Sequence, residues 1–172
     1  MQHEGRDCMT ETETRVIDAT DYRILRELMR DGRATDVTLG ERINLSSTAT
    51  ARRRKILEDQ GVITGYTANL NIGRLGFHMV AIVSIELASQ AENVLVEFEQ
   101  AVVACPSMSF CTFVSGETDL LMIVHVRSFE DYDRVYRSEL SKLPHVARIR
   151  SSFMMHEVAQ RLIAPAVLAE GG

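Results

Sequence analysis

Hydrophobic residues near the start of the chain recur at helical spacing. Ile17, Ile24 and Leu28 form one stripe, and Asp18 stands at its beginning with a second aspartate three residues later. Residues four and seven positions apart share one face of a helix, and a leading aspartate can accept hydrogen bonds from the free amides of the first turn. The pattern predicts a helix over about residues 18–31.

Two more helical blocks follow, separated by a short polar interruption. Leu39 and Ile43 lie four apart and share a face, and Asn44 then breaks the apolar period. Asparagine tolerates the left-handed backbone conformation of a sharp helix stop, and Ser46 or Ser47 can accept hydrogen bonds from the free amides of the next helix. The pattern predicts two helices joined by a tight turn, the arrangement that places a helix in a DNA groove.

Four consecutive basic residues occupy the third predicted helix: Arg52, Arg53, Arg54 and Lys55. Consecutive positions fan around a helix, so at least two of these side chains point outward whichever face is packed. A solvated surface is the alternative, because charge runs are common and usually have no specific role. The preceding turn favours DNA, and we expect one or two guanidinium groups to reach a guanine or a phosphate while the others hold the backbone.

The pattern changes again after the third helix. Residues 62–68 (VITGYTA) alternate and carry β-forming residues, which predicts a short strand or wing. Residues 69–78 contain two glycines and have the composition of a linker or hinge. We therefore expect a DNA-binding domain of three helices and a wing over residues 17–68.

The second half of the chain alternates between strand and helix patterns. Apolar runs predict strands at 79–87, 108–114, 119–126 and 146–155, and helical spacing predicts helices at 91–105 and 129–143. The order strand-helix-strand thus occurs twice. Two such units interleaved form the βαββαβ ferredoxin-like sandwich, an antiparallel sheet with both helices on one face. The predicted fold class is α+β, with a winged helix-turn-helix followed by this sandwich over residues 79–158.

One face of such a sheet is left without helices. In the first strand, Ala81, Val83 and Ile85 lie on one face and Val80 and Ile82 on the other, so both faces are largely apolar. Something must cover the helix-free face, and a second copy of the same sheet is the economical answer. We expect a homodimer whose two-fold symmetry extends to the DNA-binding domains and to a pseudo-palindromic operator.

Composition changes this picture little. The formal net charge is −5, but phosphate meets local charge within a Debye length of about 10 Å, so overall acidity is a weak objection to DNA binding. The three cysteines include no C-x-x-C pair, and the five histidines have no metal-ligand spacing. We therefore expect no disulfide framework, no metal site and no cofactor.

Location and the chain ends follow from the remaining composition. The sequence has no apolar run of about 18 residues and no signal-peptide pattern, so we expect a cytoplasmic, nucleoid-associated protein with no membrane partner. Residues 1–16 have the polar composition of a disordered leader, and residues 159–172 form a C-terminal tail.

Three separated segments carry further information. They are IDATDYRILRELMRDGRATDVTLGERINLSSTATARRRKILEDQGVITGYTANLN, VSGETDLLMIV and LPHVARIRSSFMMHEV. In order and spacing they resemble the Lrp/AsnC (feast-famine) family of prokaryotic transcription regulators, and the likeness runs from Ile17 to Val158. It implies an N-terminal helix-turn-helix and a C-terminal ferredoxin-like domain that senses amino acids or related small molecules. It also implies dimers that often assemble into tetramers or octamers, with the effector bound between dimers.

The resemblance assigns DNA-binding roles to individual positions. The start of the family's recognition helix is matched by Ser46, Ser47, Thr48 and Ala51, and the family's characteristic arginine is matched by Arg53. These join Arg52, Arg54 and Lys55 as DNA-contact candidates. The chain departs from the family at Thr50 and Arg54, which replace apolar residues. Either the third helix is rotated slightly or Arg54 lies along its edge and extends outward.

The resemblance also implies an effector site. Ser115, Gly116 and Asp119 match a turn of the G-D-x-D type at that site, with Glu117 in place of the first aspartate and Thr118 inside the turn. Other positions that line or influence the site are matched by Phe113, Phe129, Ser152 and Phe153. Without the resemblance, residues 115–119 would be interpreted as an ordinary β-turn.

Three classes of function remain open at this stage. The first is a sequence-specific transcription regulator switched by a small metabolite. The second is a low-specificity architectural DNA-binding protein of the nucleoid type, which would bend or wrap DNA without an effector. The third is a small enzyme on a ferredoxin-like frame, and it is remote because the sequence shows no nucleophile with an adjacent base and no phosphate-cradling loop.

Overall fold

The computed structural model describes residues 15–169 and divides the chain into two compact units. One unit comprises Met1–Ala68 together with Arg161–Gly172, and the other comprises Asn69–Gln160. Both ends of the described chain, residues 15–68 and 161–169, therefore belong to one unit, and the chain passes between the units twice. All of the predicted leader except Arg15 and Val16 lies outside the described residues. Within the described part, no helix has the length and apolar character needed to span a membrane.

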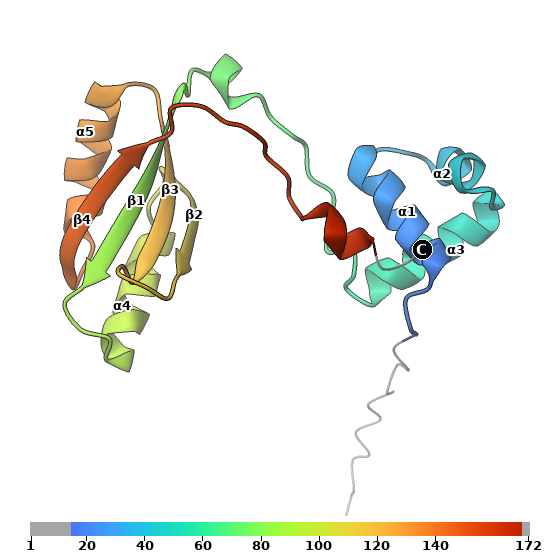
Figure 1. Ribbon diagram of the computed structural model, residues 1–172, viewed down its shortest axis with the longest axis horizontal. Helices are drawn as coiled ribbons and strands as arrows, with labels where there is room; N and C mark the ends of the chain where they lie inside the picture. Colours follow the sequence, from blue (N-terminus) through green and yellow to red (C-terminus); the bar gives the residue numbers. More distant parts are fainter. Residues whose placement is uncertain (1–14, 170–172) are drawn as a thin grey trace, which may run out of the picture. The chain divides into compact units, whose positions relative to one another are not determined.

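Three helices form the first unit: α1 (Ala19–Arg30), α2 (Asp36–Ile43) and α3 (Ser47–Asp59) (Figure 1). The first helix begins at a capping box, as the sequence predicts. The Asp18 side chain accepts from the backbone amides of Thr20 and Asp21, and the Asp21 side chain accepts from the backbone amide of Asp18. This reciprocal pairing satisfies donors that a helix start otherwise leaves free.

The turn between α2 and α3 has the predicted geometry. Asn44 ends α2 in the left-handed conformation with φ 57° and ψ 51°, and the Ser46 hydroxyl caps α3 by accepting from the amide of Ala49. Close packing of this turn also depends on Gly40, which the sequence pattern did not single out. A Cβ atom at Gly40 would lie 2.4 Å from the carbonyl oxygen of Leu45, so only glycine fits there without moving the turn.

Apolar side chains from the helices and the first connecting loop meet in a small core. Its buried members are Ile24, Leu28, Ala34, Leu39, Ile43 and Leu57. Thr50 is also fully buried, and its hydroxyl donates to the carbonyl oxygen of Ser46 at 3.0 Å. The polar side chain at this position is therefore satisfied within its own helix.

Residues 62–68 do not form the predicted strand. A strand needs a neighbouring strand with which to exchange backbone hydrogen bonds, and the described part of this unit contains no other strand. The amides of Val62 and Ile63 instead donate to the carbonyl oxygen of Leu57 at the end of α3. Within residues 62–68 only Ile63 packs against the helical core, and the other residues are exposed.

The second unit is a four-stranded antiparallel sheet with two helices. Its elements are β1 (Met79–Leu87), α4 (Glu92–Val103), β2 (Met108–Phe113), β3 (Leu120–Val126), α5 (Phe129–Ser138) and β4 (Val146–Phe153). The strand order is β2-β3-β1-β4, which is the ferredoxin-like arrangement predicted from the repeated strand-helix-strand pattern. Short 3-10 turns occupy Ile72–Leu75, inside the predicted linker, and Leu140–Lys142.

The helices cover one face of this sheet and create its core (Figure 1). Alternate residues of the two central strands are fully buried on this face: Ala81, Val83, Ile85, Leu120, Met122, Val124 and Val126. Phe98 and Val102 of α4 and Val135 of α5 pack against them. The helices predicted at 91–105 and 129–143 are confirmed, although α5 ends at Ser138 and a 3-10 turn follows it.

The opposite, helix-free face carries apolar side chains that the chain leaves partly uncovered. Ile82 lies opposite Ile123 of β3 and is 37% exposed, while Phe110 of β2, also opposite Ile123, is 51% exposed. Val80 lies opposite His125 on the same face. The Nδ1 atom of His125 is buried without a hydrogen-bond partner among the described residues.

The C-terminal segment returns to the helical unit. A 3-10 turn at Pro165–Leu168 lies against α1 (Figure 1). The carbonyl oxygen of Leu168 accepts a hydrogen bond from Arg26 Nε at 2.9 Å. The final part of the described chain is therefore attached to the first helix.

Candidate functional site

One face of α3 is presented to solvent. Ser47, Thr48, Arg52 and Lys55 are exposed and Ala51 is half-buried. These positions are separated alternately by one and three residues, so they form a continuous stripe along the helix. Ser46 precedes the stripe and is occupied as the helix cap.

Arg52 and Lys55 supply the positive charge of this stripe. Within residues 15–169, Arg52 has neither a hydrogen bond nor an ion pair through its side chain, whereas Lys55 pairs with Asp59 one turn later at 2.6 Å. Both side chains can reach an external anion, because exposed pairs of this kind are weakly held.

Arg53 points away from the stripe and toward the start of α1. Its Nη1 atom lies 2.9 Å from Oδ1 and 2.7 Å from Oδ2 of Asp18, and 2.8 Å from Oδ1 of Asp21. Arg15 contacts the same two carboxylates, at 2.7 Å in each case. Two arginines and two aspartates thus form one ion cluster between α1 and α3. Base contact by Arg53 stays a prediction, and the arrangement found here holds its guanidinium against α1.

The ion cluster contains a fully satisfied buried charge. The Asp21 side chain is 1% exposed, and both of its oxygens accept hydrogen bonds, one from Arg53 and the other from Arg15 and the Asp18 amide. The Arg53 guanidinium lowers the pKa of Asp18 far below its usual range, and Asp18 and Asp21 together raise the pKa of Arg53. Asp18 and Arg53 therefore both remain charged across the physiological pH range.

Arg54 occupies the opposite flank of α3. Its guanidinium contacts Asp36 of α2 and Glu58 of its own helix at 3.2 Å each and lies 5.1 Å from the centroid of the Tyr66 ring. Tyr66 in turn donates to Glu58. Arg54 thus lies along the edge of the helix, while Thr50 and Leu57 stay buried, so no rotation of α3 is needed to accommodate it.

The predicted effector turn lies between β2 and β3, and Asp119 fastens it to β1. One Asp119 oxygen accepts from the amide of Leu87 at 2.7 Å, and the other accepts from Gln90 at 2.8 Å. Thr118 donates to the carbonyl oxygen of Ile85. Ser115, Gly116 and Glu117 are exposed, and Gly116 has a φ of 142° that favours glycine. Phe113, just before the turn, is 42% exposed.

The remaining predicted effector residues lie elsewhere in the unit. Phe153 stands opposite Ala81 on β1, and its ring meets that of Phe129 edge-on at 4.9 Å. Tyr132 makes a second edge-on contact with Phe153 and hydrogen-bonds Ser151. These aromatic rings lie on the helix-covered side, whereas the neighbouring Ser152 lies opposite Ile82 on the helix-free face.

The structure therefore separates the nine predicted effector residues into two groups. Leu120, next to the turn, is paired with Ile85, and Phe153 is paired with Ala81. Four residues along β1 correspond to about 13 Å at the usual rise of a strand. Within one chain, the turn at residues 115–119 and the Phe129–Phe153 pair are not brought together.

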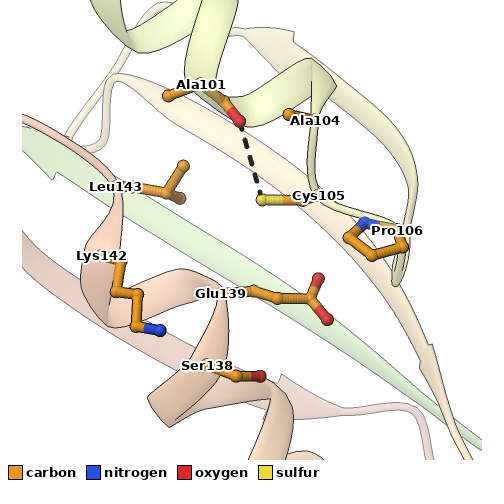
Figure 2. Close-up of a pocket in the computed structure, with 8 residues that line it drawn as sticks. All are labelled: Ala101, Ala104, Cys105, Pro106, Ser138, Glu139, Lys142 and Leu143. Carbon is orange, nitrogen blue, oxygen red and sulfur yellow. Dashed lines mark hydrogen bonds between the residues drawn. The ribbon is translucent and has the colours of Figure 1, made fainter.

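A cavity of about 290 Å³ opens where the ends of α4 and α5 approach each other. Figure 2 shows Cys105 and Glu139 at this cavity, with the Cys105 thiol directed to the carbonyl oxygen of Ala101. The Glu139 carboxylate already accepts from the amide and the hydroxyl of Ser107. Burial raises the pKa of the Cys105 thiol, which disfavours the reactive thiolate. None of the nine predicted effector residues lines this cavity.

Comparisons with known proteins match both units to characterised domains. Residues 17–64 match a winged helix-turn-helix DNA-binding domain, and residues 80–163 match the Lrp/AsnC ligand binding domain. The described residues contain no cluster of histidine, cysteine and acidic side chains able to hold a metal ion.

Relatives and solved structures span most of the chain. The proline dehydrogenase transcriptional activator of Rhodobacter capsulatus is 36% identical over 86% of this chain and 96% of its own length. The leucine-responsive regulatory protein of Haemophilus influenzae is 36% identical over 88% of this chain and 92% of its own length. A Neisseria meningitidis transcriptional regulator solved as a complex with L-methionine has a TM-score of 0.83 at 29% identity, covering 87% of this chain and 97% of that one.

An AsnC family regulator from Agrobacterium tumefaciens has a TM-score of 0.83 at 28% identity, covering 88% of this chain and 99% of that one. These relatives are transcription regulators rather than enzymes. The domain order and the shared fold agree with these likenesses over almost the full length. The chain therefore belongs to the Lrp/AsnC family and is a DNA-binding transcription regulator.

Proposed function

We propose that this regulator reads its operator with the exposed stripe of α3. The supporting observation is the division of the basic run: Arg53 and Arg54 are held by carboxylates on the two flanks of the helix, while Arg52 and Lys55 face solvent beside Ser47 and Thr48. Arginine presents a forked donor that matches guanine, and small hydroxyl residues allow close approach to base edges and phosphates. Arg52 is the base-contact candidate and Lys55 the phosphate-contact candidate.

Binding measurements on two duplexes test these roles. A duplex selected from a random pool by the wild-type protein is compared with a scrambled duplex at several salt concentrations. Arg52→Ala is expected to cost about 1–3 kcal/mol on the selected duplex, because it removes a base contact. Lys55→Ala is expected to weaken binding to both duplexes and to reduce the salt slope by about one.

Glu41→Gln serves as the control variant, because Glu41 is an exposed residue of α2 whose side chain makes no hydrogen bond or ion pair within the described chain. Unchanged binding in both the Arg52 and the Lys55 variant would refute the assignment. A wild-type protein that binds the two duplexes equally well, and bends them without an effector, would favour the architectural alternative.

The helix-free sheet face supports a homodimer. Ile82 and Phe110 remain exposed there, Ile123 lies between them, and the buried Nδ1 atom of His125 has no partner among the described residues. A second sheet would cover the apolar side chains, and its polar groups would be available to His125. Two-fold symmetry would then present two α3 helices to a pseudo-palindromic operator.

Sedimentation or light scattering tests this interface. Ile82→Glu is expected to shift the protein toward the monomer, because it places a charge within the covered apolar surface. Val96→Glu is the matched control, since Val96 is similarly exposed, at 44%, but lies on α4 on the other side of the sheet. A wild-type protein that is monomeric throughout the concentration series would contradict the dimer.

An amino acid or a related metabolite is the effector class that the family domain supports. The Neisseria neighbour was solved with L-methionine, and exposed backbone at residues 115–117 can meet a charged carboxylate or ammonium group in this chain. Because the turn and the Phe129–Phe153 pair lie apart within one chain, a site that uses both must combine residues from different protomers, in a dimer or in a tetramer or octamer.

Calorimetry with a panel of amino acids tests the effector. Glu117→Gln is expected to change the affinity or the ligand preference, whereas Glu99→Gln, on an exposed position of α4, is expected to leave both unchanged. Asp119 is unsuited to this test because its carboxylate anchors the turn to Leu87. The absence of a binding signal for every amino acid in the panel would argue against amino-acid sensing.

A further inference from the structure

Residues 15–21, which lead into α1 and form its start, make hydrogen bonds to one side of α3. Arg53 bonds Asp18 and Asp21, and the Gln60 amide donates to the carbonyl oxygen of Arg15 at 3.2 Å. Arg53 lies in α3 and Gln60 is its C-cap; they are seven residues apart, so they lie on the same side about two turns from each other. Residues 15–21 therefore contact the helix at two separate points along its length.

Two attachment points on one side restrict how the helix can move. A single point would allow α3 to pivot, whereas two points along its axis fix both its rotation and its tilt against α1. Arg54, bound to Asp36, restrains the other flank. Arg52, a member of the exposed stripe, precedes Arg53 by one residue and lies about 100° from it around the helix. Any rotation that loosens Arg53 therefore displaces Arg52 from its approach to DNA.

We propose that residues 15–21 are a positioning element for α3, with Arg53 and Gln60 as the positioning residues, so that sequence preference depends on side chains that do not touch DNA. This inference rests on the proposed reading of DNA by the exposed stripe. Hydrogen bonds to base edges tolerate displacements of only a few tenths of an ångström, so a small change in the helix angle is enough to lose them.

Burial makes this cluster more than a surface ion pair. Exposed pairs contribute little, but Asp21 is 1% exposed and depends on Arg53 and Arg15 to satisfy its oxygens. Loss of Arg53 leaves one oxygen of a buried carboxylate without its partner, which is strongly unfavourable. The structure can respond by moving α3 or the start of α1, and either movement alters the geometry presented to DNA.

Arg53 could read a base or position α3, and these two roles predict opposite effects on specific DNA binding when the charge of Asp18 is removed. If Arg53 reads a base, Asp18 competes with DNA for the guanidinium, and Asp18→Asn strengthens specific binding. If Arg53 positions α3, Asp18→Asn weakens specific binding. Asparagine caps a helix about as well as aspartate, so this variant keeps the start of α1 while removing the charge that faces Arg53.

The experiment measures the affinity of the full chain for the selected and the scrambled duplex, well below the melting temperature of each variant. Asp18→Asn is expected to lower the ratio of the two affinities by about tenfold, comparable to one mismatched base pair, and to leave the salt slope unchanged. Glu41→Gln corrects for the general gain in phosphate attraction when one negative charge is removed. Gln60→Ala tests the second attachment point without changing charge and is expected to lower the ratio in the same direction.

A double-mutant cycle completes the test. Once Arg53→Met has removed the guanidinium, Asp18→Asn is expected to have little further effect on the ratio, because both act through one contact. An unchanged or increased ratio in both Asp18→Asn and Gln60→Ala would overturn the positioning role. A wild-type protein that shows no preference between the duplexes would instead count against the proposed function itself, so the two failures are distinguishable.

Discussion

The helical unit and the sheet unit are stabilised by different interactions. Among residues 15–169, fourteen buried apolar residues form the core of the sheet unit and six form that of the helical unit. The smaller core is supplemented by the Arg15–Asp18–Asp21–Arg53 cluster and by side-chain caps on each of its three helices. Small domains bury a lower fraction of their surface, so directed polar contacts carry a larger share of their stability.

This difference suits the separate tasks of the units. Apolar burial is not directional and tolerates repacking, which suits a domain that we propose associates with a copy of itself. Ion clusters and caps fix angles, which suits a helix that we propose meets base edges. The comparison predicts that truncation of core side chains lowers the stability of the sheet unit most. In the helical unit, the sensitive positions are those where the backbone packs closely and those where polar side chains bond.

The largest effect is expected from Phe98→Ala in the sheet unit. Phe98 is fully buried under α4, and truncation of a buried phenylalanine costs about 3–5 kcal/mol through lost burial and the cavity left behind. Urea unfolding measures the change. Val96→Ala, at an exposed position on the same helix, is the control and should change stability by less than about 0.5 kcal/mol.

Gly40→Ala should have the next largest effect, in the helical unit. The new methyl group would meet the carbonyl oxygen of Leu45 at 2.4 Å, and overpacking of this kind costs about 1–3 kcal/mol. The operator affinity should also fall, because the turn sets the start of α3. Gly65→Ala has open space around it and should be neutral or slightly stabilising. Equal stability of the two variants would contradict the close approach of Gly40 to the Leu45 carbonyl group.

A smaller effect is expected at the helix caps, where α4 differs from the three helices of the helical unit and from α5, which Ser128 caps. Ser46→Ala removes the cap of α3 and should cost about 1 kcal/mol in unfolding experiments. The N-cap of α4, Ala91, has no side-chain hydrogen bond. Ala91→Ser should therefore stabilise the sheet unit slightly. A loss of stability at Ala91→Ser would show that the start of α4 has other requirements.

The smallest effect at neutral pH is expected from the charge of Asp18, which is partly exposed. Hydrogen bonds from Arg53 hold its pKa well below the usual value of about 3.9. The stability that this carboxylate contributes is present above about pH 4 and is lost as the pH falls below it. Unfolding of wild type and Asp18→Asn over a pH series should show a difference that narrows in acid. A constant difference would mean that the charge of Asp18 does not contribute.

Helices and strands were predictable because their signals are local. Asn44, Ser46 and Asp18 act within four residues of their own positions, and the apolar period of each strand reports which face is covered. The prediction of a strand at residues 62–68 was wrong because a strand depends on more than local signals. Its alternation was real, but a strand also requires a partner, and residue propensity does not supply one.

The roles of the four basic residues were not predictable from their run. Arg53 finds its carboxylates 32 and 35 residues earlier in the chain, a distance that helical periodicity does not address. One signal was present: Asp21 falls on the apolar stripe of α1, three residues before Ile24, and a charge on a buried face needs a partner. The separation of the effector candidates along the sheet likewise depends on strand register, which residue patterns alone did not determine.

The attachment of Leu168 to Arg26 changes what counts as the DNA-binding part of this protein. A fragment that stops at Ala68 would contain all three helices but would lack the carbonyl group that α1 binds. The start of the same helix carries Asp18 and Asp21, so the turn at Pro165–Leu168 and α3 both contact α1. Removal of the turn at Pro165–Leu168 would therefore take away a contact of α1 and leave the segment before β1 unchanged.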